Sequence, residues 1–300
     1  MDLWFSEYHT KTVRLSIKVT KQLFSADSGI QRIDVFESKE FGRFLTLDGF
    51  MMLTERDEFI YHDMIVHVPM AVLLSAAGKP GKTAPGRAGS KADLSVLLIG
   101  AGDGGAVREL CRYKCIKKID MVEIDEMVVK VCKEYLPQTA GCFDDPRLTV
   151  YYQDGLKFVR SRENIYDLII VDSTDPLGPG EGLFKKEFYG NCYNALTDAG
   201  ILVNQHESPF YSADATAMQR AHKRIVESFP ISRVYQAHIP TYPSGHWLFG
   251  FASKKLHPIN DLVAEKWNSL GLKTRYYNTN LHKGAFALPN YVEDLLRDVE

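Results

Sequence analysis

Five carboxylates stand just after the predicted strands of this chain, where a bound ligand would meet them. They are Asp103, Glu123, Asp154, Asp172 and Asp175. In an open parallel sheet, ligands bind outside the carboxyl ends of the strands, so we expect these side chains to share one crevice. Crowded carboxylates raise one another's pKa unless cations neutralise them. The residue types therefore predict a site for small, positively charged molecules.

The glycine-rich run at 100–105, Gly-Ala-Gly-Asp-Gly-Gly, indicates that one of these molecules is a nucleoside. The apolar run Val96 to Ile99 precedes it and a helical pattern follows, which is the order of a nucleotide-binding βαβ unit. A dinucleotide site must favour a pyrophosphate, whereas Asp103 would repel a pyrophosphate and attract a sulfonium or an ammonium. The turn thus favours a cationic nucleoside. The alternative is that Asp103 only caps the following helix.

The five acids can be assigned different tasks from their positions. Glu123 follows Gly105 by 18 positions, near the spacing at which an acid binds ribose hydroxyls. Asp154 could accept a hydrogen bond from an adenine amino group, which leaves the other three acids for positive charge. Each acid taken singly could also be a helix cap or an Asx turn. Five of them at one edge of a sheet favour a binding site.

The chemistry that suits this site is alkyl transfer from a sulfonium nucleoside to an amine. An amine with a pKa of about 10 is protonated at neutral pH and cannot attack. A positioned carboxylate can take its proton, an effect that typically contributes about 10²- to 10⁴-fold. A sulfonium is already a good leaving group, so neither a metal nor a covalent enzyme nucleophile is needed. His and Cys form no metal-ligand spacing, and we expect no metal.

Composition favours an ordinary soluble globular protein of the cytoplasm. The chain has 300 residues, 45% of them hydrophobic and 25% charged, with a formal net charge of −2. This balance predicts neither a nucleic-acid partner nor a membrane partner. No apolar stretch approaches the length of a membrane span, and the first residues lack the pattern of a signal peptide. The five cysteines are odd in number and are typical of reduced packing residues.

The elements that must position these residues follow from hydrophobic periodicity. Residues 1–54 predict a small antiparallel β domain, and residues 55–300 a catalytic domain of alternating strands and helices. Residues 78–93 predict a flexible loop, because Gly, Pro, Lys and Ser break every period. Segments 231–239 and 247–253 predict an antiparallel pair at one edge. The fold class is therefore α/β, with a Rossmann-like, methyltransferase-type, mostly parallel sheet and a small N-terminal antiparallel β domain.

Several spaced motifs together carry a family resemblance. They are Leu-Asp-Gly at 47–49, Thr-Glu-Arg-Asp-Glu-Phe at 54–59, the glycine run at 100–105, Met-Val-Glu-Ile-Asp at 121–125, Phe-Asp-Asp-Pro-Arg at 143–147, Asp-Gly at 154–155, Val-Asp-Ser-Thr-Asp-Pro at 171–176, Asn-Gln-His-Glu-Ser-Pro at 204–209 and Pro-Thr-Tyr-Pro-Ser-Gly at 240–245. Across roughly residues 4–255 the chain resembles the polyamine aminopropyltransferases, and within them the spermidine synthases. The resemblance implies transfer of the aminopropyl group of decarboxylated S-adenosylmethionine to putrescine, giving spermidine and methylthioadenosine. It also implies no cofactor besides this co-substrate, a mobile gate near residues 173–182, and a homodimer or homotetramer.

The same resemblance implies roles for individual residues. Asp172 would be the base that accepts the proton of the attacking amine, and Asp175 would hold the distal amine of putrescine. Asp103 would bind the aminopropyl amine of the donor. The remaining expected contacts are Gln31, Glu123, Asp154 and Gly155 for the donor, and Tyr61, His62, Gln205 and Tyr242 for the acceptor.

The chain departs from the family pattern at Ala101, at His62, at His206, which replaces a small residue, and in the long loop at 78–93, and two rival functions remain. Ala101 replaces a common glycine, which is tolerable if its φ is negative. His62 stands where some members have glutamine, which leaves the acceptor open among putrescine, cadaverine, agmatine and spermidine. The first rival is an S-adenosylmethionine-dependent methyltransferase, which would need a partner for the donor's carboxylate where this chain has Asp103. The second is a non-enzymatic polyamine- or nucleoside-binding protein.

Overall fold

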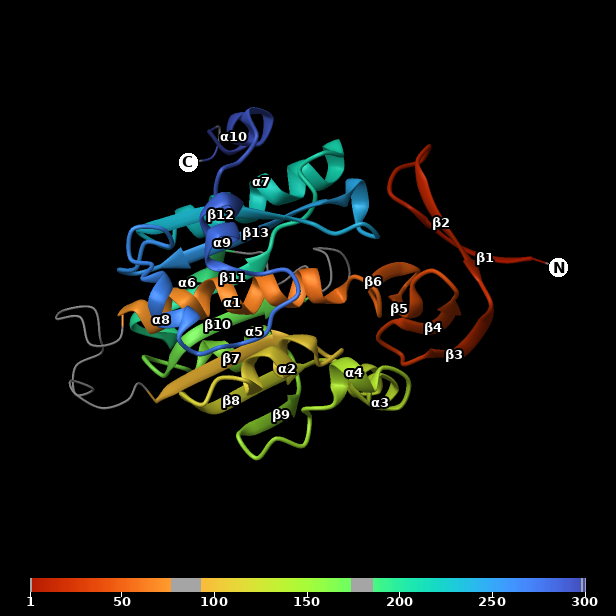
Figure 1. Cartoon of the computed structure of the whole chain (residues 1–300), viewed down its shortest axis with the longest axis horizontal. Helices are drawn as coiled ribbons and strands as arrows, with labels where there is room; N and C mark the ends of the chain where they lie inside the picture. The colour runs from red at the N-terminus through yellow and green to blue at the C-terminus, as the bar shows by residue number, and fades with distance from the viewer. Residues whose placement is uncertain (1, 77–92, 174–185, 298, 300) are drawn as a thin grey trace.

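The computed structural model describes residues 2–76, 93–173, 186–297 and 299. Within these ranges the strands form three sheets, of two, four and seven strands. The two small sheets come from the first 54 residues, and helices cover the large sheet built from the rest (Figure 1). The predicted fold class, a mostly parallel Rossmann-like sheet with an N-terminal antiparallel β region, is confirmed. The predicted loop at 78–93 falls outside the described residues except for Asp93.

The N-terminal strands pair antiparallel throughout. The strands are β1 (Leu3–Tyr8), β2 (Arg14–Val19), β3 (Lys21–Asp27), β4 (Arg32–Ser38), β5 (Gly42–Leu47) and β6 (Phe50–Thr54). Asp48 and Gly49 join β5 to β6 with φ of 51° and 84°. Two successive left-handed residues make the tight turn that an Asp-Gly pair favours between hairpin strands. This hairpin brings Met51 and Met52 to the mouth of the central sheet.

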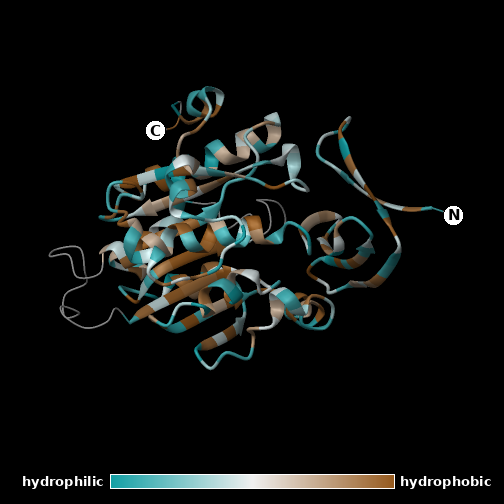
Figure 2. Cartoon of the chain, viewed as in Figure 1, coloured by the Kyte–Doolittle hydropathy of each residue, from teal (hydrophilic) through white to brown (hydrophobic). Residues whose placement is uncertain are grey.

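The large sheet has the order β12-β13-β11-β10-β7-β8-β9. Its strands are β7 (Leu94–Gly100), β8 (Ile116–Glu123), β9 (Leu148–Tyr152), β10 (Tyr166–Asp172), β11 (Leu196–Gln205), β12 (Ile231–His238) and β13 (His246–Ser253). The first five are parallel to one another, β13 pairs antiparallel with β11, and β12 and β13 form the predicted antiparallel pair at one edge. The central strands β7 and β10 are almost wholly apolar because helices bury both of their faces (Figure 2).

Helices on each face of the sheet pack against separate hydrophobic cores. One core joins Val96 and Leu98 of β7 to α1, and the other joins Leu97 and Ile99 to the helices after β9 and β10. The helices are α1 (Glu58–Ala76), α2 (Gly105–Cys111), α3 (Glu126–Tyr135), α4 (Pro137–Ala140), α5 (Gly155–Arg160), α6 (Lys186–Ala195), α7 (Ser212–Val226), α8 (Ala264–Asn268), α9 (Thr279–Ala285) and α10 (Asn290–Arg297), with a short 3-10 turn η2 (Pro243–Gly245).

Helix α1 is the central buried helix of the molecule. Among the described residues it is the one helix long and apolar enough to span a membrane, with a mean hydropathy of 1.4 over its best window. The structure buries 89% of that window inside the fold, so α1 is a core helix here. Glu58 and Asp63 interrupt its apolar residues, which is why the sequence suggests no uninterrupted span. Its first two turns carry Tyr61 and His62 to the carboxyl edge of the sheet.

The C-terminal segment, in which the sequence shows no motif, packs on α1. The carboxylate of Asp63 accepts hydrogen bonds from the backbone N–H groups of Arg275, Tyr276 and Tyr277 at 2.8–3.2 Å. The indole of Trp267 donates to the hydroxyl of Tyr113 at 2.9 Å. These contacts anchor the segment to the face of the sheet that α1 covers, away from the predicted site.

Candidate active site

The glycine turn after β7 lies directly against the end of β10. A Cβ atom on Gly100 would lie 2.0 Å from the backbone oxygen of Asp172, so only glycine fits at this position. The backbone N–H of Ala101 donates to that same oxygen at 2.8 Å. This close approach of two strand ends brings the carboxylates of Asp103 and Asp172 together. The glycine turn thus shapes the site because it lets the backbone after β7 approach the backbone at the end of β10.

We expected an alanine to be tolerated at position 101 if its φ were negative, but the φ of Ala101 is positive. Its φ is 66°, in the left-handed region between Gly100 at 85° and the later Gly104 at 87°. A non-glycine residue costs about 1–2 kcal/mol in this conformation. The conformation is held because Ala101 is buried and its backbone bonds both Asp172 and Gly104. The left-handed conformation of Ala101 therefore costs free energy that a glycine at this position would not cost.

One pocket at the carboxyl edge of the sheet collects the residues that the sequence singled out. Ten of them line it: Gln31, Tyr61, His62, Asp103, Glu123, Asp154, Gly155, Asp172, Gln205 and Tyr242. Asp175 and all of the expected gate except Ser173 lie outside the described residues. The hairpin of β5 and β6 closes the pocket from the N-terminal side through Leu47 and Met51. Four of the five predicted carboxylates therefore face one cavity.

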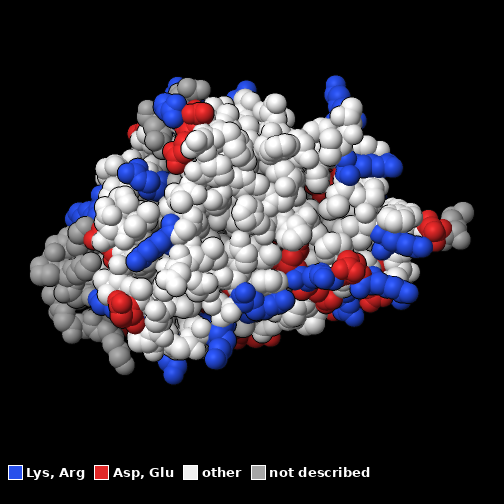
Figure 3. Space-filling model, turned by 45° about the horizontal axis from the view of Figure 1, so that its top comes forward, with Lys and Arg blue, Asp and Glu red and all other residues white. Residues whose placement is uncertain are grey.

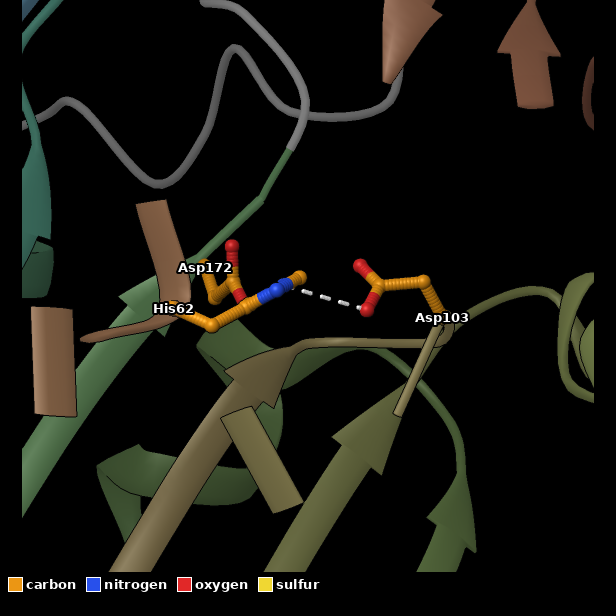
Figure 4. A group of neighbouring side chains, drawn as sticks. All are labelled: His62, Asp103 and Asp172. Carbon is orange, nitrogen blue, oxygen red and sulfur yellow. Dashed lines mark ion pairs between the residues drawn. The ribbon is translucent and has the colours of Figure 1, made fainter. Parts of the chain in front are cut away.

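Asp103 and Asp172 are neighbours with different environments (Figure 4). Asp103 accepts a hydrogen bond from the backbone N–H of Gly105 at 2.7 Å and forms an ion pair with His62 Nε2 at 3.2 Å. Burial disfavours its charge, but His62, Gly105 and Arg108 outweigh that and lower the pKa of Asp103. Burial and the charge of Asp103 raise the pKa of Asp172 to about 6, against the opposing effects of His62 and Tyr61. Asp103 is thus the permanent anion, and Asp172 can exchange a proton near neutral pH.

The two carboxylate oxygens of Asp172 differ in their hydrogen bonding. Its Oδ1 accepts from the hydroxyl of Tyr61 at 2.7 Å. Its Oδ2 is buried and has no hydrogen-bond partner among the described residues. A buried carboxylate oxygen without a partner costs free energy unless a ligand satisfies it. The structure therefore leaves one carboxylate oxygen of Asp172 able to accept a hydrogen bond or a proton from a ligand in the pocket.

The donor-side residues are also held by local hydrogen bonds. Glu123 Oε1 accepts from the backbone N–H of Asp125 at 2.9 Å, and burial raises the pKa of Glu123 to about 7. Asp154 caps α5 by accepting from the backbone N–H of Leu156 at 2.8 Å. The capping that we weighed as an alternative is thus real, and it aims Asp154 at the pocket that it lines. Gln31 Nε2 donates to the carboxylate of Asp125 at 3.1 Å.

Aromatic rings flank the other end of the pocket. The rings of Tyr61 and Tyr242 have centroids 6.0 Å apart, and Tyr242 also contacts Trp247 edge to face at 4.8 Å. The hydroxyl of Tyr242 donates to the backbone oxygen of Met52 at 2.5 Å. Gln205 Nε2 donates to Glu207 at 2.9 Å. Such walls suit a short aliphatic chain with polar ends.

Two groups of side chains among the described residues have the spacing of metal ligands. The first is His62, Asp103 and Asp172, whose ligand atoms all lie within 4.8 Å of one another. The second is Asp63, His67 and Glu109. In the second group the two arginines beside Glu109, Arg108 and Arg112, already supply positive charge. The first group faces the pocket, where any cation would meet two carboxylates.

Sequence reasoning missed the charged residues behind the pocket wall. Glu58 bonds His62 Nδ1 at 2.6 Å, and Arg108 holds Glu58 through two hydrogen bonds at 2.9 and 3.0 Å. The separation of Glu58 and His62 by four positions on a helical pattern is a signal that could have paired them. Arg108 lies 50 positions away from Glu58, and only the contact of α1 with α2 brings the two together.

A Rossmann-like sheet with an acidic pocket at the carboxyl ends of its strands is typical of transferases that act on nucleosides. Comparisons with known proteins name the group. A profile of the spermine/spermidine synthase domain matches residues 58–262, and one of the spermidine synthase tetramerisation domain matches residues 3–55. Polyamine aminopropyltransferases from Alkaliphilus oremlandii and Clostridium perfringens strain 13 are 66% and 67% identical over 300 residues, covering all of both chains.

Solved structures agree with these relatives. A crystal structure of spermidine synthase with the transition-state analogue AdoDATO is 41% identical with a TM-score of 0.90, covering 98% of this chain and 95% of that one. The crystal structure of spermidine synthase from Thermotoga maritima is 39% identical with a TM-score of 0.87 and the same coverage. The chain belongs to the spermine/spermidine synthase family and is an aminopropyltransferase.

Proposed function

We propose that this enzyme transfers the aminopropyl group of decarboxylated S-adenosylmethionine to putrescine, giving spermidine and methylthioadenosine. The observation that carries the proposal is the pairing of Asp103 and Asp172 in one buried pocket beside the glycine turn. That pairing suits a nucleoside which brings two positive charges and no carboxylate. The solved relative holding the analogue AdoDATO supports the same reaction.

The donor would bind along the ends of β7, β8 and β9. Glu123 would accept hydrogen bonds from the ribose hydroxyls, with Gln31 on the same side. Asp154 and Gly155 would hold the adenine, whose amino group donates to a carboxylate. Asp103 would bind the terminal ammonium of the aminopropyl group. S-adenosylmethionine itself carries a carboxylate at this end, and Asp103 would repel it.

The acceptor would lie between Tyr61 and Tyr242, with one amine at Asp172. The Oδ2 atom of Asp172 would take a proton from that amine, whose lone pair then attacks the aminopropyl carbon bonded to sulfur. The new N–C bond forms as the C–S bond breaks, and the C–S electron pair neutralises the sulfonium as methylthioadenosine leaves. With a pKa of about 6, Asp172 is mostly ionised at neutral pH and ready to act. We still expect Asp175 to bind the distal amine and Gln205 to lie near it.

The wider properties of the protein follow from the same proposal. On the face shown in Figure 3, Lys and Arg are scattered among Asp and Glu and form no broad basic patch, as is common for an enzyme that acts on small molecules. The match to a tetramerisation domain supports assembly of this chain into a homotetramer. We propose a cytoplasmic enzyme whose long apolar helix α1 is buried in its core and which needs no metal or further cofactor.

One assay tests the proposal and its rivals. Purified protein is incubated with decarboxylated S-adenosylmethionine and, separately, putrescine, cadaverine, agmatine or spermidine, and the products are identified by mass. We expect an aminopropyl adduct of putrescine to form fastest. Methylated products from S-adenosylmethionine would indicate a methyltransferase instead, and binding without any product would indicate a non-enzymatic binding protein.

A further inference from the structure

The imidazole of His62 lies between two carboxylates inside the wall of the pocket. Nδ1 is 2.6 Å from Glu58 Oε2, and Nε2 is 3.2 Å from Asp103 Oδ1. Ionised carboxylates only accept hydrogen bonds, and a neutral imidazole has one N–H group to donate. A neutral ring would therefore direct a lone pair at one of the two carboxylates. The arrangement therefore favours an imidazolium with a proton on each nitrogen in the free enzyme.

The groups behind His62 hold it in this state. Arg108 binds both oxygens of Glu58, and neither residue lines the pocket. The ring lies against the start of α2, where a Cβ atom on Gly105 would come within 2.1 Å of it. The ring is 2% exposed and cannot exchange its partners for water. The charges of Arg108, Glu58, His62 and Asp103 alternate in sign across the wall.

Within the described part of the chain, the other charged or titratable groups that face His62 come from the pocket itself. Tyr61 packs its ring edge to face at 5.4 Å, and Asp172 lies beside Asp103. Burial opposes the charge of His62, but Asp103 and Glu58 outweigh it and raise the pKa of His62 well above its ordinary value. His62 is thus the internal cation that offsets the two carboxylates before substrates arrive.

We propose that the aminopropyl ammonium of the donor replaces the Nε2 proton of His62, so that donor binding releases one proton to solvent. Two positive charges at hydrogen-bond distance repel each other, and the ammonium must sit at Asp103. When the Nε2 proton leaves, His62 keeps its Nδ1–H on Glu58 and turns the Nε2 lone pair to the ammonium. The ammonium then donates one hydrogen to His62 and another to Asp103. This inference rests on the proposed function, because it takes that donor as the ligand.

Glu58 and Arg108 act in this scheme as positioning residues. Their role is to keep the remaining proton on Nδ1, in the way that a carboxylate orients the histidine of a metal site or a catalytic triad. Neither touches the substrate. Their effect should therefore appear in proton release and in its pH dependence.

Calorimetry of the full-length protein with decarboxylated S-adenosylmethionine measures the released proton. Titrations at pH 8 in phosphate and in Tris, which differ in ionisation enthalpy, give the number of protons released per donor. At this pH Asp172 and Glu123, with pKa values of about 6 and about 7, are almost fully ionised and together contribute roughly 0.1 proton. We expect the release of more than about 0.5 proton per donor bound. Below the pKa of His62, the Kd for the donor should fall by up to about tenfold for each unit by which the pH rises.

Three variants assign the proton. His62→Gln keeps an N–H donor for Asp103 without a titrating group, so its release should fall to about 0.1 proton. Glu58→Gln removes one of the two charges that hold the proton, so its release should fall as well while the donor still binds. Glu109→Gln is the matched control, since Glu109 also pairs with Arg108 but contacts His67 in place of His62. It should release as many protons as the wild type.

Equal heats in the two buffers for the wild type would overturn the inference, and so would undiminished release from His62→Gln. Either result leaves the proposed function standing, because the donor still binds. Absence of any binding heat together with absence of product would instead overturn the proposed function and this inference with it.

Discussion

The ionisation of Asp172 decides when this enzyme can work. The base must be unprotonated, and burial beside Asp103 raises its pKa to about 6. Its catalytic form is therefore present above that pH and lost as the pH falls through it. We predict that kcat/KM falls by about tenfold between pH 8 and pH 5, with most of the loss below pH 6. Initial rates from pH 5 to 8, with the melting temperature followed at each pH, check this, and a constant kcat/KM down to pH 5 would contradict the assignment.

Removal of that carboxylate gives a second test at the same scale. Asp172→Asn keeps the shape of the side chain and its contact with Tyr61 but cannot accept the proton. We predict that kcat falls by about 10²-fold or more while the donor still binds. Single-turnover rates measure the first effect and calorimetry the second. Unchanged turnover would end the assignment of Asp172 as the base.

Gly105 tests whether the glycine turn serves His62. A Cβ atom there would lie within 2.1 Å of the imidazole, so we predict that Gly105→Ala displaces His62 and raises the donor KM by about tenfold or more, the effect of losing one charged contact of roughly 1.5 kcal/mol. Gly190 in α6 has no atom within 4 Å of the same position and provides the control. Gly190→Ala should leave kinetics unchanged and stabilise the helix by about 0.5–1 kcal/mol. Equal kinetics for both variants would refute the role of Gly105.

At the scale of elements, the ends of the parallel strands explain why much of the site could be predicted. Apolar runs such as 96–99 mark buried strands, and the acid after each run must lie at the same edge of a parallel sheet. The sequence could not show α8 and α9, of five and seven residues, because helices this short depend on contacts such as those of Asp63 and Trp267. It also could not show the left-handed φ of Ala101, which the adjoining end of β10 imposes.

Asp125 joins the N-terminal sheet to the donor edge. Its carboxylate accepts from Ser28 at 2.6 Å and from Gln31 at 3.1 Å, and its backbone N–H binds Glu123. It also caps α3 through Met127. One side chain thus positions two of the expected donor contacts from different sheets.

We predict that Asp125→Asn raises the donor KM about 5- to 30-fold, the effect of losing roughly 1–2 kcal/mol of hydrogen bonding, with kcat within about threefold. The asparagine oxygen can still cap α3, so the fold should persist. Asp48→Asn, in an exposed turn of the N-terminal sheet, is the control and should leave KM unchanged. Steady-state kinetics with saturating putrescine decide this, and a loss of kcat with unchanged KM would contradict the positioning role.

At the scale of the whole molecule, the β1–β2 hairpin projects from the rest of the chain and exposes apolar side chains (Figure 1). Trp4 is 53% exposed, within the segment that matches the tetramerisation domain. We predict that Trp4→Glu weakens assembly by about 30- to 150-fold, since burying a side chain of this size contributes roughly 2–3 kcal/mol. Leu270→Glu, at 45% exposure on the C-terminal segment, should not. Sedimentation velocity measures both, and an unaltered distribution for Trp4→Glu would contradict this interface.

The central claim is that the pocket binds a nucleoside whose terminal ammonium has no carboxylate beside it. Asp103 and Asp172 would repel a carboxylate at this position. Calorimetry with decarboxylated S-adenosylmethionine and with S-adenosylmethionine tests it most directly, because the two ligands differ only in that group. We predict that the decarboxylated ligand binds at least about 30-fold more tightly, as expected when like charges are kept apart in a buried site. Equal affinity for the two ligands would contradict the account.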